Sequence, residues 1–189
     1  MRQNYRECSV RNNYNIQASL IITLLMVSIN INAADLPPLT HELTSVNKRL
    51  AAPELRLQNM DEEIVDIKDF KGKVVVVNFW ATWCPPCRRE MGSLERLYQA
   101  TKDKNVEILA VNIGEDIDTV FSFMGTVEPS PNFEVVFDPD AASMSSWKVR
   151  GLPTTYIIDP EGIIVYRAIG GREFDHPEIL KKVLALTKQ

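Results

Sequence analysis

The sequence predicts an α/β domain in which helices flank a central β-sheet. Val74–Trp80 is a nearly unbroken run of β-branched and aromatic residues, which is typical of a strand covered on both faces. Apolar residues then recur at spacings of three and four over Met91–Tyr98, and this pattern indicates a helix. Val106–Ile113 is a second segment rich in Val and Ile, so the centre of the chain is expected to alternate strand, helix and strand.

Further elements are expected on both sides of this unit. Turn-like residues at Asn59–Asp61 separate two alternating segments, which favours a hairpin. Asp175 and Glu178 are expected to form a capping box at the start of the last helix. The predicted elements are strands at Glu54–Gln58 and Glu63–Asp66, a helical turn at Ile67–Phe70, a helix starting at Gly114–Asp116, a strand at Phe133–Phe137, a short helix after Asp138-Pro139, strands at Tyr156–Asp159 and Ile163–Ile169, and the last helix.

Residues 1–34 are predicted to be a signal peptide or an N-terminal membrane anchor. Three arginines precede the apolar, uncharged run Ala18–Ile31, and small residues at 32–34 offer a cleavage point. The run is shorter and more polar than the ~20 apolar residues of a spanning helix, but the uncharged window 12–34 leaves an anchor open. A hydrophobic helix of the folded domain is a third interpretation, which the lack of amphipathic spacing disfavours. Because the arginines keep the N-terminus inside, we expect a periplasmic or otherwise extracytoplasmic protein.

The rest of the chain is expected to be a linker at residues 35–52 and a single domain at residues 53–189. Pro37 and Pro38 mark the linker, in which Leu43–Leu50 suggests a short helical turn. The whole chain has a net charge of −4, and the basic leading segment makes the remainder more acidic still. This charge argues against nucleic acid or an anionic membrane surface as a partner.

Two cysteines are the candidate reactive groups. Cys8 precedes the apolar run, so the exported part carries only Cys84 and Cys87. Two residues separate them where the central strand ends and a helix begins, and the partial positive charge of a helix N-terminus stabilises a thiolate. We expect Cys84 to be the more exposed and to attack a substrate disulfide, and Cys87 to resolve the mixed disulfide.

Other uses of two cysteines are weaker interpretations. A structural disulfide gains little from closing so small a loop. A zinc site needs a second Cys or His pair, and the two histidines of the chain, His41 and His176, stand alone in the sequence. Copper(I) bound by two thiolates stays open. We therefore expect no cofactor and no bound metal in the main interpretation.

The motif at Asn78–Met91, NFWATWCPPCRREM, is followed by GLPTT at Gly151–Thr155 and by Asp159–Gly162. This combination resembles the thioredoxin superfamily and, more closely, the TlpA/ResA-like thiol:disulfide oxidoreductases, which include the reductants of cytochrome c maturation. The resemblance covers residues 53 to 189. It implies a thioredoxin fold, with a central mixed sheet flanked by helices, an N-terminal β-hairpin and a central helical insertion.

The resemblance also implies a docking edge for substrate. Pro153 would follow a cis peptide bond opposite the cysteines, and Leu152 would offer its backbone to an incoming peptide, as in β-augmentation. From the residues alone, an ordinary turn proline stays open. Trp83 is expected to cover the thiols and receive substrate, whereas Trp80 and Trp147 are expected in the core.

The sequence departs from the family at two positions. Asn78 stands where general thioredoxins carry a buried Asp that accepts a proton, and an amide cannot ionise. This moves the proton chemistry to Glu90, about one helical turn after Cys87, at a position to which the ResA-like group gives a redox role. The alternative is a solvated Glu90 paired with arginines. Gly92 stands where the family usually has Pro, which puts the placement of Glu90 in doubt.

The sequence thus predicts an exported enzyme, a thioredoxin-like thiol:disulfide oxidoreductase that works mainly as a reductase. Its expected partners are disulfide-containing exported proteins, such as apocytochrome c, and a membrane thiol-electron donor, with a possible membrane tether through the N-terminus. The direction of transfer rests on the resemblance. The alternatives are an oxidant or isomerase of exported disulfides, and a copper(I)-binding thiol chaperone, against which the lack of a Met/His cluster counts.

Overall fold

The computed structural model describes residues 39–188 of the 189-residue chain. These residues form an eight-stranded sheet with the order β1-β8-β7-β4-β5-β6-β2-β3. The elements are β1 (Thr44–Ala51), β2 (Arg56–Asn59), β3 (Ile64–Asp66), the 3-10 helix η2 (Ile67–Phe70), β4 (Val74–Trp80), α2 (Pro85–Thr101), β5 (Val106–Ile113), α3 (Ile117–Met124), β6 (Glu134–Asp138), α4 (Ala142–Ser146), β7 (Thr154–Ile158), β8 (Ile163–Ile169) and α5 (Pro177–Leu186). The expected signal or anchor at residues 1–34 lies outside the described residues. Within 39–188, no helix combines the length and apolar character needed to cross a membrane.

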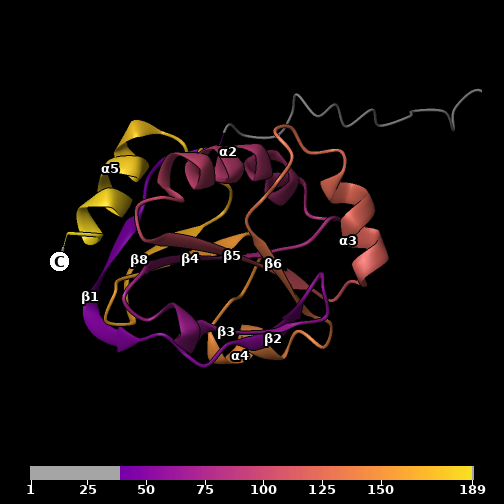
Figure 1. Cartoon of the computed structure of the whole chain (residues 1–189), viewed down its shortest axis with the longest axis horizontal. Helices are drawn as coiled ribbons and strands as arrows, with labels where there is room; N and C mark the ends of the chain where they lie inside the picture. The colour runs from indigo at the N-terminus through magenta and orange to yellow at the C-terminus, as the bar shows by residue number, and fades with distance from the viewer. Residues whose placement is uncertain (1–38, 189) are drawn as a thin grey trace, which may run out of the picture. The chain divides into compact units, whose positions relative to one another are not determined.

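Helices cover both faces of the sheet (Figure 1). Apolar residues of α2, α3 and α5 belong to one core cluster on one face. α4 lies on the other face, beside a second core cluster that contains Trp147 and Tyr156. β4 pairs in parallel with β5 and antiparallel with β7, so the sheet is mixed. The expected fold is confirmed, including the β2–β3 hairpin and the helix α3 between β5 and β6.

The central strand β4 fixes which side chains face α2. All seven of its residues are buried, as the sequence predicts. Side chains alternate between the faces of a strand. Val74, Val76 and Trp80 pack in the cluster that contains α2, whereas Val77 and its alternate neighbours pack in the opposite cluster. By the same alternation Asn78 faces α2, which places a polar amide beneath the cysteines.

The predicted linker at 35–52 and its helical turn at Leu43–Leu50 are wrong for residues 44–51. These residues form β1, which pairs antiparallel with β8 at one edge of the sheet. The side chains of β1 are almost all exposed, so the segment has no alternating apolar pattern to reveal a strand. Leu43 is buried while Leu50 is 45% exposed, which rules out a shared apolar helix face. The folded unit therefore begins before residue 53.

The predicted capping box of the last helix is also wrong. His176 is the N-cap of α5, and its Nδ1 accepts a hydrogen bond from the backbone N–H of Glu178 at 3.3 Å. Asp175 is used elsewhere, since it accepts a hydrogen bond from the guanidinium of Arg96 on α2 at 2.6 Å. The His176 ring stacks on His41 with 3.8 Å between ring centroids, so the two histidines do not stand apart as the sequence suggests. Among residues 39–188, no group of three or more His, Cys, Asp or Glu side chains is arranged to hold a metal ion.

Candidate redox site

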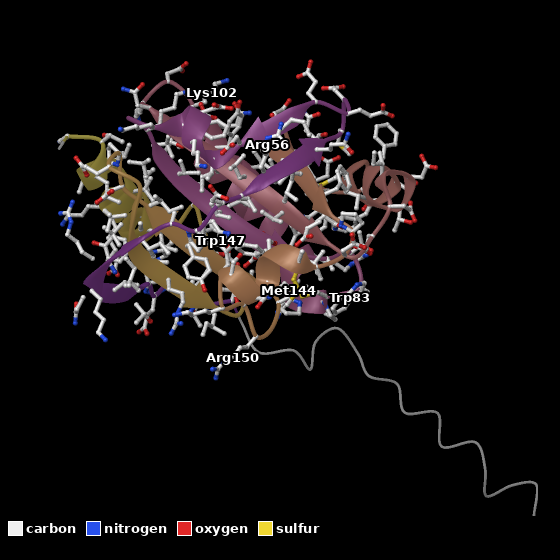
Figure 2. The ribbon with its side chains drawn as sticks, turned by 90° about the horizontal axis from the view of Figure 1, so that it is seen from below. Arg56, Trp83, Lys102, Met144, Trp147 and Arg150 are labelled. Carbon is white, nitrogen blue, oxygen red and sulfur yellow. A yellow bond between two sulfur atoms is a disulfide. The ribbon has the colours of Figure 1, made fainter. Side chains whose placement is uncertain are left out.

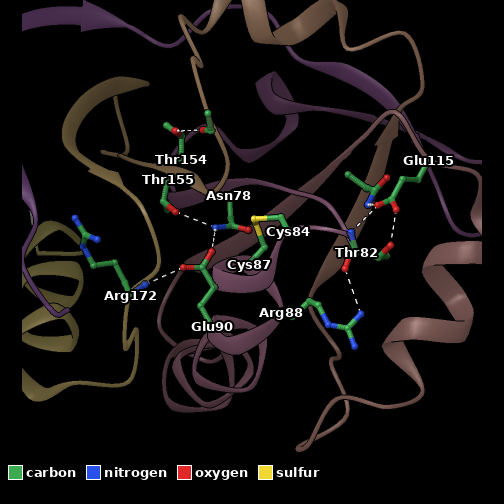
Figure 3. The surroundings of a disulfide bond; sticks show 12 residues. Asn78, Thr82, Cys84, Cys87, Arg88, Glu90, Glu115, Thr154, Thr155 and Arg172 are labelled. Carbon is green, nitrogen blue, oxygen red and sulfur yellow. Dashed lines mark hydrogen bonds between the residues drawn. A yellow bond between two sulfur atoms is a disulfide. The ribbon is translucent and has the colours of Figure 1, made fainter. Parts of the chain in front are cut away.

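Cys84 and Cys87 form a disulfide at the start of α2 (Figure 3). Cys84 is the N-cap residue of the helix, Cys87 lies in its first turn, and their Cα atoms are 5.3 Å apart. Pro85 and Pro86 occupy the first two helical positions, where a missing N–H removes no intrahelical hydrogen bond. Cys84 is 3% exposed and Cys87 is 0% exposed. The expected order of exposure holds, but the protein covers both sulfurs more fully than the sequence suggests.

Trp83 lies at the surface next to the disulfide. Its side chain is 66% exposed, in contrast to the buried Trp80 and Trp147, which are in the core as expected. Figure 2 shows Trp83 and Arg150 toward one edge of the molecule and Lys102, which follows α2, toward the opposite edge. The residue immediately before Cys84 is therefore a large exposed aromatic group that an incoming protein can contact.

The loop before β7 lies at the same end of the sheet as the cysteines. The peptide bond between Leu152 and Pro153 is cis, as predicted. The next residue, Thr154, pairs with Phe79 near the end of β4, which sets the loop beside the segment that carries the cysteines. Among the described residues, the backbone N–H and C=O of Leu152 have no hydrogen-bond partner. A short stretch of main chain next to the disulfide is thus open to pairing.

Glu90 is fully buried beneath the motif. Its Oε1 accepts a hydrogen bond from Asn78 Nδ2 at 2.8 Å, and its Oε2 accepts one from the backbone N–H of Arg172 at 2.9 Å. Burial raises the pKa of Glu90 from 4.5 to about 8, because loss of water disfavours the charged carboxylate more than the two hydrogen bonds favour it. The alternative of a solvated Glu90 paired with arginines is wrong.

Asn78 connects Glu90 to the cysteine pair. Its Nδ2 donates to Glu90 and also to Thr155 Oγ1 at 2.9 Å, and its side chain is 0% exposed. Figure 3 shows the amide between the Glu90 carboxylate and the disulfide, with the amide oxygen directed toward the sulfurs. The Asn78 amide thus lies between the Glu90 carboxylate and the sulfurs (Figure 3).

A second carboxylate, Glu115, fixes the loop before Cys84. It accepts hydrogen bonds from the backbone N–H of Thr82 at 2.7 Å, from the Thr82 hydroxyl, and from Asn112 Nδ2 at 2.8 Å. Arg88 donates to the Thr82 carbonyl at 3.2 Å and lies over the Phe123 ring, 4.6 Å from its centroid. Sequence reasoning missed Glu115, because an acidic residue before a helix looks like ordinary helix-start chemistry.

Gly92 is explained by a close approach of another loop. A Cβ at this position would lie 2.5 Å from the carbonyl oxygen of Glu128. Glu95 holds the same loop from α2 by accepting hydrogen bonds from the backbone N–H and the side-chain amide of Asn132, at 2.7 and 3.0 Å. Gly92 therefore lets a loop cross α2, and its departure from the family's proline leaves Glu90 buried at the site.

Comparison with known proteins identifies the family. The family model described as AhpC/TSA family matches residues 49–167. The chain is 35% identical over 133 residues to the thiol-disulfide oxidoreductase ResA of Bacillus thuringiensis strain Al Hakam, covering 70% of this chain and 76% of that protein. The chain belongs to the AhpC/TSA family and resembles the ResA proteins. This confirms the resemblance to ResA-like thiol:disulfide oxidoreductases.

Other relatives agree with this ResA-like assignment. The chain is 39% identical over 121 residues to ResA of Bacillus subtilis, and the match spans 64% of this chain and 66% of that relative, slightly less than two thirds of its length. Among solved structures, a putative thiol:disulfide interchange protein DsbE from Chlorobium tepidum aligns with a TM-score of 0.68 at 29% identity, covering 76% of this chain and 99% of that one. A thioredoxin domain of a Bacteroides vulgatus thiol-disulfide oxidoreductase aligns with a TM-score of 0.64 at 28% identity, covering 74% and 99%. These likenesses confirm the thioredoxin fold.

Proposed function

We propose that this chain is an exported thiol:disulfide oxidoreductase that reduces disulfides of extracytoplasmic proteins, with apocytochrome c as one candidate client. The observation that carries the proposal is the buried Cys84–Cys87 pair at the N-terminus of α2, beside a cis-proline loop whose backbone is open to pairing. The ResA relatives support the same chemistry.

In the proposed cycle, the reduced protein transfers two electrons to a client. The Cys84 thiolate attacks one sulfur of the client disulfide, the client S–S bond breaks, and the other client sulfur leaves as a thiolate that takes up a proton. Cys87 then loses its proton and attacks the Cys84 sulfur, which releases the second client thiol. A membrane dithiol donor would restore the reduced pair and become a disulfide itself.

Two features support Cys84 as the attacking group. It is the residue of the pair that retains some exposure, 3% against 0% for Cys87. It is also the N-cap of a 17-residue helix, where the unpaired N–H groups stabilise negative charge. During attack, the free N–H and C=O of Leu152 would pair with the client backbone, and Trp83 would contact client side chains.

Glu90 would set the charge state beneath the pair. Because the pKa of Glu90 is raised to about 8, the carboxyl is largely protonated at neutral pH. Above that pH its negative charge disfavours a second negative charge on the nearby thiols. Neutral Glu90 would therefore disfavour thiolate formation less than ionised Glu90, and it would exchange the proton of Cys87 as a buried carboxyl beneath the pair.

Trapping tests the proposed attack. Cys87→Ala leaves the mixed disulfide unresolved, so covalent complexes with client proteins should accumulate and should be released by dithiothreitol. Cys84→Ala is the matched control and should trap none, since the attacking sulfur is absent. Equal trapping by both variants would contradict the assigned roles.

The equilibrium with glutathione tests the direction of transfer. A reductant should have a potential toward that of thioredoxin, about −270 mV, whereas a value near −120 mV would overturn the reductase assignment and support an oxidant.

Export is tested by mass spectrometry of the mature protein. A new N-terminus near residue 35 indicates a cleaved signal, an intact N-terminus in the membrane fraction indicates an anchor, and retention in the cytoplasm contradicts the proposal.

A further inference from the structure

Asn78 has an unused hydrogen-bonding atom in the most buried part of the site. Both N–H groups of its amide are occupied, by Glu90 Oε1 at 2.8 Å and by Thr155 Oγ1 at 2.9 Å. Its Oδ1 is buried and accepts no hydrogen bond from any described residue. A buried acceptor without a donor destabilises the folded protein, so a functional role would explain why this site retains one.

The orientation of the amide is set by its neighbours. The carboxylate of Glu90 and the hydroxyl of Thr155 hold the NH₂ group on one side, which directs Oδ1 toward the disulfide (Figure 3). The side chain is 0% exposed on a strand whose residues are all buried, so the amide is held in place by packing as well. Oδ1 therefore faces the sulfurs in the oxidised protein.

The redox state decides whether this acceptor finds a donor. A disulfide sulfur carries no hydrogen, so the oxidised pair has nothing to donate to Oδ1. A thiol has an S–H group, which is a weak donor. Cys87 is 0% exposed, so its thiol cannot turn to water for an acceptor.

We propose that Asn78 Oδ1 accepts a hydrogen bond from the Cys87 thiol once the disulfide is reduced, and that this bond stabilises the reduced form. This inference rests on the proposed redox function and deepens it. On reduction the S–S bond breaks, two electrons enter from a dithiol donor that becomes a disulfide, and each sulfur gains one electron. Cys87 takes up a proton and shares it with Oδ1, while Cys84 becomes a thiol or a thiolate according to pH.

Asn78 would act on the Cys87 thiol differently from an ionisable side chain at the same position. The amide accepts a hydrogen bond from the Cys87 thiol but cannot remove its proton. Cys87 therefore stays protonated, and Cys84, which retains slightly more exposure, remains the attacking sulfur. In resolution of a mixed disulfide, the Cys87 proton must pass to another base. Two different groups thus act on the Cys87 proton: Asn78 accepts its hydrogen bond, and another base removes it.

The test compares Asn78→Leu with Thr155→Val in the full chain. Asn78→Leu removes Oδ1 with little change in size, whereas Thr155→Val removes one partner of the NH₂ group and leaves Oδ1 in place. The equilibrium of each protein with dithiothreitol is measured at pH 6, about two units below the pKa of Glu90, where this carboxyl is neutral. We expect the equilibrium constant for reduction to fall about tenfold in Asn78→Leu, which corresponds to a potential lower by ~30 mV, and to change less than about twofold in Thr155→Val.

A spectroscopic measurement keeps the proposal testable if Asn78→Leu does not fold. In a Cys8→Ser, Cys84→Ser background, Cys87 is the only thiol, and a hydrogen bond lowers the frequency of its S–H stretch relative to that of the denatured protein. Asn78→Asp, which keeps an oxygen of the same shape, should retain the lowered frequency. An S–H frequency in the folded protein equal to the denatured value would overturn the proposal, as would equal reduction equilibria in wild type and Asn78→Leu. Neither readout requires a client, so failure of the proposed reductase function would be seen separately in the trapping experiment.

Discussion

Two carboxylates flank the disulfide, and they differ in their access to water and in what they hold (Figure 3). Glu115 is half-buried and accepts three hydrogen bonds, two of them from Thr82 in the loop before Cys84. Glu90 is 0% exposed and accepts one hydrogen bond from a side chain and one from the backbone. The two acidic groups therefore differ in role because they differ in their exposure to water. Glu115 positions the motif, whereas Glu90 carries a charge that can change near neutral pH.

The largest expected effect is on the pH dependence of stability. The pKa of Glu90 is about 8 in the folded protein against 4.5 ordinarily, so between these values the folded state binds the proton that the unfolded state releases. Stability should therefore be highest below pH 4.5, as far as Glu90 is concerned, and should fall as pH rises toward 8. The loss is at most roughly 1.4 kcal/mol per pH unit in this window.

Urea unfolding of the oxidised protein at pH 5, 6, 7 and 8 measures this slope. Glu90→Gln should flatten it, because glutamine does not titrate. Glu115→Gln should keep the wild-type slope. A slope that is the same in wild type and Glu90→Gln would mean that Glu90 is ionised in the folded protein throughout this range.

The next effect concerns thiol reactivity. In the reduced protein, ionised Glu90 should disfavour the Cys84 thiolate above pH 8, and Glu90→Gln should lower the apparent pKa of Cys84 by about one unit. The rate of alkylation by iodoacetamide between pH 6 and 10 reports this pKa. Glu115→Gln is the matched control on the other side of the pair and should leave the profile unchanged. An unaltered profile in Glu90→Gln would remove Glu90 from the thiol chemistry.

A smaller effect is expected from the loop that Glu115 holds. Thr82→Val removes the hydroxyl that donates to Glu115 but keeps the backbone N–H bond, and should destabilise the oxidised protein by about 1 kcal/mol. The same change should leave the pH slope of stability intact, since Glu90 is untouched. Urea unfolding at pH 5 and pH 8 checks both statements, and a changed slope would show that the two sides are coupled.

The smallest effect on stability is expected from Trp83, which follows Thr82 in the same loop. Its side chain is 66% exposed, so Trp83→Ala should change the unfolding free energy by less than about 0.5 kcal/mol. Reduction of a protein disulfide should nevertheless slow several-fold, whereas reduction of a small disulfide such as oxidised glutathione should not. Equal slowing for both substrates would argue that Trp83 acts on the cysteines and not on the client.

The sequence predicts the core of this molecule well and its edges poorly. β4 is visible because its seven buried residues form a nearly unbroken apolar and β-branched run, and the motif after it locates the cysteines, whereas the cis bond before Pro153 is expected from the family resemblance. β1 has no such apolar pattern, since its backbone pairs with β8 while almost all of its side chains remain in water. Exposed strands are specified by their neighbours more than by their own residues.

At the site, features set by neighbouring residues in the sequence can be predicted, whereas features set by distant residues cannot. The pattern around Cys87 indicates that Glu90 is near the pair, but its burial depends on Asn78 and on Arg172, which is 82 positions away in the sequence. The hydrogen bonds of Glu115 to Thr82, 33 positions away, likewise join separate segments. Gly92 is understood only when the Glu128 loop crosses it. Contacts of this kind follow from the fold and produce no periodic pattern in the sequence of either segment.

The edge strand β1 has a consequence for where the chain can be shortened. β8 pairs with β7 on one side and with β1 on the other, so β1 satisfies backbone groups of β8 that would otherwise face water. A truncated form starting at residue 53 would keep both cysteines yet leave β8 as an open edge, able to recruit a strand from a second molecule. Removal of residues 1–34 alone would keep β1 in the chain. β1 thus also protects the edge of the sheet against self-association.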